Sequence, residues 1–113
     1  MINIIKKYES IIADYKIINW EIEPTSYRFK ANMIFTNGTT LFVKDYLFSH
    51  KRKYSFHWQD ENENLILRWD NAEHWKDIET FPFHKHEENK VLSSTETSLE
   101  DVLEYISHKI RQK

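Results

Sequence analysis

Residues 27–43 read YRFKANMIFTNGTTLFV, and this stretch decides the fold. Apolar or aromatic side chains occupy every second position from Tyr27 to Phe35, while positions 28, 30 and 32 are polar. A period of two is typical of a β-strand with one buried face. Asn37-Gly38 follows directly, and this pair between two alternating runs predicts a hairpin. The turn type expected is I′, in which both central residues have positive φ.

The alternation continues on both sides of this hairpin. We expect further strands from about Thr39 to Ser49, from Lys51 to Gln59 and from Leu65 to Trp69, because each run alternates and a polar segment separates the last two. Together they give a meander of about four antiparallel strands. The segment Ile17–Glu23 also alternates, and it supplies a candidate fifth strand that ends at Pro24.

Amphipathic helices are predicted at both ends of the chain. From Ile2 to Tyr15, apolar residues recur at steps of three and four. A second apolar stripe starts after Thr97, which is expected to form a capping box with Glu100, and it continues to Ile110. The predicted fold class is α+β: an antiparallel sheet of four or five strands, with an N-terminal and a C-terminal helix covering one face.

Length and composition limit the function classes. The chain has 113 residues, which is the size of one domain, so residues 1–113 are expected to fold as one unit. It has no cysteine, which excludes disulfides and thiolate chemistry. Its single glycine excludes glycine-rich phosphate loops, and no cofactor is expected. Without a long apolar run or a signal segment, we expect a cytoplasmic protein that does not enter the membrane.

Residues 67–91 read LRWDNAEHWKDIETFPFHKHEENKV and hold the densest group of side chains able to do chemistry. If Pro82–Glu88 is extended, His84 and His86 project from one face and Lys85 from the other. Two imidazoles in one small volume indicate general acid–base catalysis, because imidazole titrates near neutral pH. A metal-independent ribonuclease fits this pair: one histidine removes the 2′-hydroxyl proton and the other protonates the leaving oxygen.

Neighbouring residues complete this hypothesis. Asp70 would orient an imidazole, Arg68 or Lys85 would stabilise charge on the phosphoryl oxygens, and His74 is a third candidate acid or base. Two alternatives stay open. The three histidines and Asp70 also supply the nitrogen and oxygen ligands that zinc or manganese prefers. The histidines are otherwise structural, making hydrogen bonds where sheet and helix meet.

A second candidate site is the basic run His50, Lys51, Arg52, Lys53, which lies between two strands that carry aromatic residues. Net charge over the whole chain is -2, so a nucleic-acid site has to be a local patch of this kind. We expect Lys51, Arg52 and Lys53 to bind a phosphate backbone, with nearby rings stacking on unpaired bases. The alternative is a solvated hairpin turn.

Four segments together resemble a known family. In order they are Lys53-Tyr-Ser-Phe-His-Trp, then Leu67-Arg-Trp-Asp-Asn-Ala with His74 shortly after, then Phe81-Pro-Phe-His-Lys-His, and finally Thr97-Ser-Leu-Glu-Asp-Val-Leu. Their order and spacing are similar to those of TumE-type toxin components of bacterial and archaeal toxin–antitoxin pairs. The resemblance covers about Lys51 to Ile110.

The resemblance implies a small growth inhibitor encoded beside a helix-turn-helix antitoxin that binds it and shuts it off. The residues on motif positions are Arg68, Asp70, His74, His84, Lys85 and His86. Family members often have histidine where this chain has Phe83. The ribonuclease hypothesis, with RNA as substrate, comes from the residues and not from the family. Its alternative is a non-enzymatic module that binds protein or nucleic acid, and aromatic residues on both faces of the sheet would suit a homo-oligomer.

Overall fold

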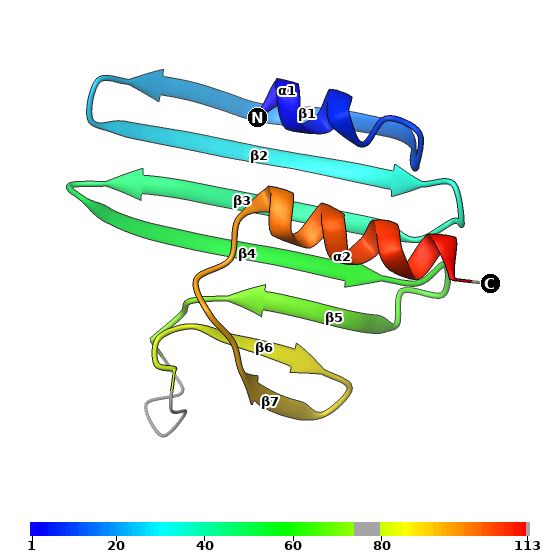
Figure 1. Cartoon of the computed structure of the whole chain (residues 1–113). Coiled ribbons are helices and arrows are strands. Elements are labelled where there is room, and N and C mark those ends of the chain that lie inside the picture. The colour runs from blue at the N-terminus through cyan, green and yellow to red at the C-terminus, as the bar shows by residue number, and fades with distance from the viewer. Residues whose placement is uncertain (74–79, 113) are drawn as a thin grey trace.

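The computed structural model of the protein describes residues 1–73 and 80–112. Within these ranges the elements follow in the order α1 (Ile2–Lys7), β1 (Ile12–Glu23), β2 (Ser26–Phe35), β3 (Thr40–Phe48), β4 (Lys51–Gln59), β5 (Leu65–Asp70), β6 (His84–Glu87), β7 (Lys90–Ser93) and α2 (Leu99–Arg111). Each strand pairs antiparallel with the next, so the sheet is a meander in the order β1 to β7 (Figure 1).

The α+β class and the antiparallel meander are confirmed, but the expected number of strands is wrong. The sheet in the described ranges has seven strands instead of four or five. The additional strands β6 and β7 have four residues each. Each is too short to show a clear period of two, so neither was counted as a strand, although β6 lies within the segment Pro82–Glu88 that was considered as extended.

The N-terminal helix is much shorter than predicted. It ends at Lys7, and the residues from Ile12 onward form β1, which is the candidate fifth strand extended toward the N-terminus. Local periodicity favoured a helix as far as Tyr15. Pairing with β2 along the whole length of β1 and the β-branched residues Ile12, Ile17 and Ile18 favour the strand, and these tertiary contacts outweigh the local preference.

The hairpin at Asn37-Gly38 is confirmed, but its turn is not type I′. Only Gly38 has positive φ (87°), and its N–H donates to the Phe35 carbonyl at 2.9 Å. Asn37 instead accepts hydrogen bonds through its side-chain oxygen from both the N–H and the hydroxyl of Thr39. These bonds fix a longer loop between the strands, with glycine at the left-handed position.

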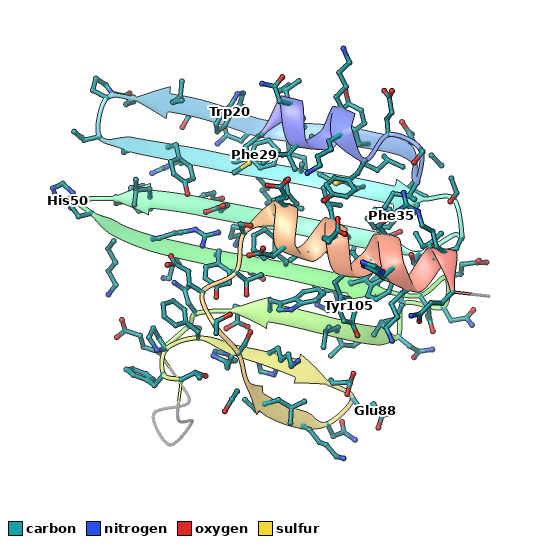
Figure 2. All side chains as sticks on the ribbon, viewed as in Figure 1. Trp20, Phe29, Phe35, His50, Glu88 and Tyr105 are labelled. Carbon is teal, nitrogen blue, oxygen red and sulfur yellow. The ribbon has the colours of Figure 1, made fainter. Side chains whose placement is uncertain are left out.

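Helix α2 has the predicted apolar stripe and a shifted cap. Ser98 is the N-cap, and it forms the capping box with Asp101 instead of Thr97 with Glu100. Leu99, Val102, Leu103 and Ile106 are fully buried against the sheet. Figure 2 shows Tyr105 of α2. Its ring lies edge-on to the rings of Trp58 and Trp69 on the sheet.

Both helices pack on the same face of the sheet (Figure 1). They touch each other through Lys7 with Glu100 and through the hydroxyl of Tyr8, which donates to Glu104 at 2.6 Å. The core fills this side, from Phe29 and Phe35 on β2 to Leu67 and Trp69 on β5. We call the opposite side, which carries the alternate residues of each strand, the open face. No described helix covers it.

Candidate functional site

The pairing of β5 with β6 brings four of the predicted catalytic residues together. Asp70 lies opposite His84, and Arg68 lies opposite His86. Because alternate residues of a strand share a face, all four side chains lie on the open face. Trp69, between Arg68 and Asp70 in sequence, points the other way into the core.

A carboxylate is the centre of this group. His84 Nε2 lies 2.6 Å from Asp70 Oδ1, and His86 Nε2 lies 3.3 Å from Asp70 Oδ2. Arg68 donates through Nε to Asp70 Oδ2 at 3.1 Å. The two imidazole rings are 4.8 Å apart between centroids and nearly perpendicular. We call Asp70, His84 and His86 the Asp–His–His cluster.

Burial separates the members of this site. The side chains of His84 and Asp70 are 1% and 6% exposed, whereas those of His86 and Arg68 are 21% and 41% exposed. A molecule in solution therefore meets His86 and Arg68 first. They line a surface hollow of about 580 Å³ together with His57.

The backbone fixes the orientation of the buried histidine. His84 Nδ1 lies 2.9 Å from the carbonyl oxygen of Pro82, and since a carbonyl only accepts, this nitrogen carries a proton and donates. His84 Nε2 is thereby directed at the carboxylate of Asp70. A second bond from the backbone N–H of Ala72 to Asp70 Oδ1 helps to hold that carboxylate in place.

The exposed histidine has an altered pKa. Burial lowers the pKa of His86 below its ordinary 6.5, and the charge of Asp70 partly opposes this effect, while His84 and Arg68 add to it. His86 is therefore mainly neutral at neutral pH, in the form that accepts a proton. Burial also lowers the pKa of His57 on the neighbouring strand.

Of the two other predicted catalytic residues, Lys85 lies apart from this group, and His74 is not among the described residues. Lys85 lies opposite Trp69, on the side of the sheet that faces the core, in agreement with the expected alternation. His74 lies outside the described residues, so its place as a third acid or base stays a prediction.

The basic run divides into different environments. Arg52 points toward the core side, where it donates to both carboxylate oxygens of the buried Asp45 at 2.9 and 3.0 Å. These hydrogen bonds and this charge raise the pKa of Arg52 against the effect of burial. Lys51 is exposed and lies 3.1 Å from Glu73, and Lys53 is exposed on the open face. His50 lies at the tip of the β3–β4 hairpin (Figure 2).

The Asp–His–His cluster also has the composition of a metal site. One ligand atom from each residue can be chosen so that all three lie within 4.8 Å of one another. Two imidazoles and a carboxylate suit zinc, manganese or iron. The bond from His84 Nδ1 to a backbone carbonyl is the usual outer contact of a histidine ligand.

Two residues of this region were not assigned to the site from the sequence. His57 lies opposite Arg68, on the polar phase of β4, and its Nε2 is 3.1 Å from Gln59 Oε1. Asn71 ties the end of β5 to β4, because its side chain accepts from the N–H of Tyr54 and donates to the carbonyl of Arg52. The alternation along Lys51–Gln59 places His57 on the polar side of this strand, and this pattern could have assigned it to the site.

The fold and this site define a small α+β protein with a polar, histidine-rich cluster on the open face of a meander sheet. The family model described as Toxin TumE matches residues 1–112, so the chain belongs to the Toxin TumE family. Membership extends the resemblance seen at Lys51–Ile110 to the N-terminal half, and it implies a toxin component of a toxin–antitoxin system with an antitoxin as its partner. No curated protein and no solved structure matches the chain. No described helix is long and apolar enough to span a membrane.

Proposed function

We propose that this chain is the toxin of a type II pair and that it arrests growth by cleaving RNA at the Asp–His–His cluster. One observation carries the proposal: a partly exposed histidine, His86, contacts a buried carboxylate that also binds an exposed guanidinium. Asp70 thus holds a base and a phosphate-binding group side by side, 3.3 and 3.1 Å from its Oδ2.

The chemistry follows from this arrangement. Neutral His86 accepts the proton of an RNA 2′-hydroxyl, whose oxygen then attacks the adjacent phosphorus. Asp70 orients the ring and stabilises the imidazolium that forms. Arg68 stabilises the charge that develops on the phosphoryl oxygens. As the 2′ oxygen bonds to phosphorus, the bond from phosphorus to the 5′ oxygen breaks and a 2′,3′-cyclic phosphate forms. The leaving 5′ oxygen takes a proton from solvent water, and the His86 imidazolium returns its proton to solvent. Because His84 is 1% exposed, we assign it the role of positioning Asp70, without contact to RNA.

The partner proposed is the helix-turn-helix antitoxin of the pair. The toxin carries a net charge of -2, which suits a basic partner with affinity for DNA. Binding of this antitoxin would block access to the cluster and so prevent cleavage. Copurification of each variant with the antitoxin therefore serves as a test that the variant has its native structure.

The testing experiment compares growth arrest and RNA cleavage for His86→Gln, Asp70→Asn and the control His108→Gln. His108 is an exposed histidine on α2, on the other side of the sheet. Growth after induced expression and cleavage of a labelled RNA are both measured, and folding is checked by circular dichroism and by copurification with the antitoxin. We expect His86→Gln to lower the cleavage rate by about 10²–10⁴-fold and to relieve the arrest, because a general base contributes that much.

The control should arrest growth and cleave RNA like the wild type. If folded His86→Gln and His84→Ala/His86→Ala variants arrest growth as strongly as the wild type, the cluster is not catalytic. The non-enzymatic binding module then replaces the ribonuclease, with the histidines in structural roles.

A further inference from the structure

On strands β2 to β5 the charged residues of the open face are almost all basic, whereas β1 adds the acidic Glu21 and Glu23 to this face, opposite Arg28 and Ser26. On strands β2 to β5, Asp70 is the one acidic residue of this face, and it is buried beside Arg68. The basic residues of the same face on these strands are Arg28, Lys30, Lys44, Lys51, Lys53 and Arg68. Since the whole chain is slightly acidic, this positive charge is a local property of the open face on strands β2 to β5.

One cross-strand row leads over this face to the candidate catalytic site. Asn32 on β2 lies opposite Phe42, Phe42 opposite His57, His57 opposite Arg68, and Arg68 opposite His86. Neighbouring strands are about 4.8 Å apart, so the row from β2 to β6 is about 19 Å long. Its length is that of a binding surface for several nucleotides.

Aromatic rings lie along this row and beside it. Phe42 is 38% exposed, and its ring is 6.0 Å from that of His57. Tyr46 and Phe48 continue the aromatic surface on β3, 6.0 Å apart, and the guanidinium of Arg28 lies 5.1 Å from the Phe48 ring. These rings do not belong to the core, which lies on the other side of the sheet.

The surface is hollowed in a way that connects the row to the cluster. A hollow of about 380 Å³ is lined by Lys30, Phe42, Lys44, His57 and Arg68 among others. His57 and Arg68 also line the hollow that contains His86. The two depressions thus share a wall, and a chain lying in the first reaches the second.

We propose that the open face binds single-stranded RNA, with phosphates on Lys30 and Lys44, bases on Phe42 and His57, and the strand directed to Arg68 and His86. Exposed rings beside basic residues on a flat sheet bind unstacked bases, and paired bases in a duplex do not offer their faces to such rings. This inference rests on the proposed function for the identity of the nucleic acid. It adds the surface and the single-stranded form.

The test measures binding of a fluorescein-labelled oligouridine to the His86→Gln protein, which holds the RNA uncut, by fluorescence anisotropy over a range of KCl concentrations. We expect added Lys30→Glu/Lys44→Glu to weaken binding at least tenfold. The slope of log K against log salt should become shallower by about 1.4, from two lost phosphate contacts at about 0.7 each. The control Lys6→Glu/Lys109→Glu makes the same change in net charge on the two helices, and it should weaken binding less than twofold.

Phe42→Ala separates stacking from charge. We expect it to weaken binding at least fivefold with no change in the salt slope, because a stacked ring contributes affinity that salt does not screen. Phe42 is partly exposed on the open face, so its truncation should leave the circular dichroism spectrum unchanged.

Three results would overturn the inference. The first is equal weakening by the open-face and helix variants, which indicates unspecific charge. The second is tight RNA binding by Lys30→Glu/Lys44→Glu together with loss of antitoxin binding, which makes the face a protein-binding surface. The third is binding of duplex RNA as tight as that of the single strand.

The same measurements keep this inference apart from the proposed function. If the His86→Gln protein binds single strands through the open face but the wild type cuts no RNA, the RNA surface stands and the ribonuclease fails. If the wild type cuts RNA and the open-face variants bind and cut equally well, the ribonuclease stands and the RNA surface fails.

Discussion

Replacing Arg52 by methionine tests which part of the basic run is structural. Arg52 is 16% exposed and Asp45 is 3% exposed, and their two hydrogen bonds are 2.9 and 3.0 Å long. The guanidinium carbon also lies 4.3 Å from the centroid of the Tyr54 ring. Methionine retains much of the apolar length of the side chain, so the substitution mainly removes the charge that compensates Asp45.

The expected cost follows from the burial of the remaining carboxylate. Removing one partner of a buried ion pair costs about 3–5 kcal/mol, because the other charge is left without compensation. Asp45 keeps the hydrogen bond from the hydroxyl of Tyr27 at 2.9 Å, which places Arg52→Met at the lower end, about 3 kcal/mol. For a chain of this size, that loss lowers Tm by about 10 °C or more.

The assay is urea unfolding followed by tryptophan fluorescence, with Lys53→Met as the matched control. Lys53 is exposed on the open face one residue further along β4, and its replacement should change the free energy of unfolding by less than about 0.5 kcal/mol. The double variant Arg52→Met/Asp45→Leu should be more stable than Arg52→Met alone, since no buried charge remains. Unchanged stability of Arg52→Met would refute the structural assignment and return Arg52 to the RNA-binding set.

Three further predictions concern metal, pH and the helix cap. In the wild type, RNA cleavage should survive exhaustive chelation. Added zinc should inhibit cleavage, because zinc would occupy the Asp–His–His cluster. If chelation abolishes cleavage and manganese restores it, the protein is a metal-dependent nuclease instead. The hydrogen bond from Tyr8 lowers the pKa of Glu104, so Tyr8→Phe should destabilise the protein at pH values above the ordinary glutamate pKa of 4.5. The destabilisation should become smaller as pH falls through the lowered pKa of Glu104. Urea unfolding at several pH values checks this, and an equal loss of stability at all pH values would contradict it. Ser98→Ala should lower the free energy of unfolding by about 1 kcal/mol in the same assay, because it removes the helix cap. A larger loss of stability in Thr97→Ala than in Ser98→Ala would contradict the observed cap.

The central hairpins could be predicted because their signal is local. The strand at Lys51–Gln59 was predicted with its observed bounds, and the strand after the polar segment was predicted with an error of one residue. In both, one face is buried and the other is wet, so the hydrophobic period reports the structure directly. The end of α1 was not predictable in this way, because the pairing that converts Ile12–Tyr15 into strand involves distant residues.

The candidate site was predictable in composition but not in geometry. That His84 and His86 share a face follows from alternation alone. Their contact with Asp70 depends on the register between β5 and β6, and thirteen residues separate Asp70 from His84 in the sequence. No local pattern fixes a pairing across such a connection, because the gain comes from the finished sheet.

The structural role of Arg52 could have been predicted from the alternation of the strands, although the run of basic residues indicated a phosphate-binding role. Asp45 continues the buried phase of Leu41 and Val43 on β3, and Arg52 occupies the buried phase of β4 that continues with Tyr54. A charged residue on a buried phase needs an opposite charge nearby. The phase of each residue, and not the run of basic letters, separates Arg52 from the lysines on its two sides.

The exposure of the site residues also determines how binding and catalysis can be separated. Side-chain exposure rises from 1% at His84 through 21% at His86 to 41% at Arg68. The proposed base His86 therefore lies at the surface, next to the buried His84 and Asp70. The proposed RNA-binding residues Lys30 and Lys44 lie on β2 and β3, beyond β4 and β5 from His86. Changes on those strands should therefore raise KM with little effect on kcat, whereas changes at His86 should lower kcat, because His86 and Arg68 are the residues proposed to touch the reacting atoms.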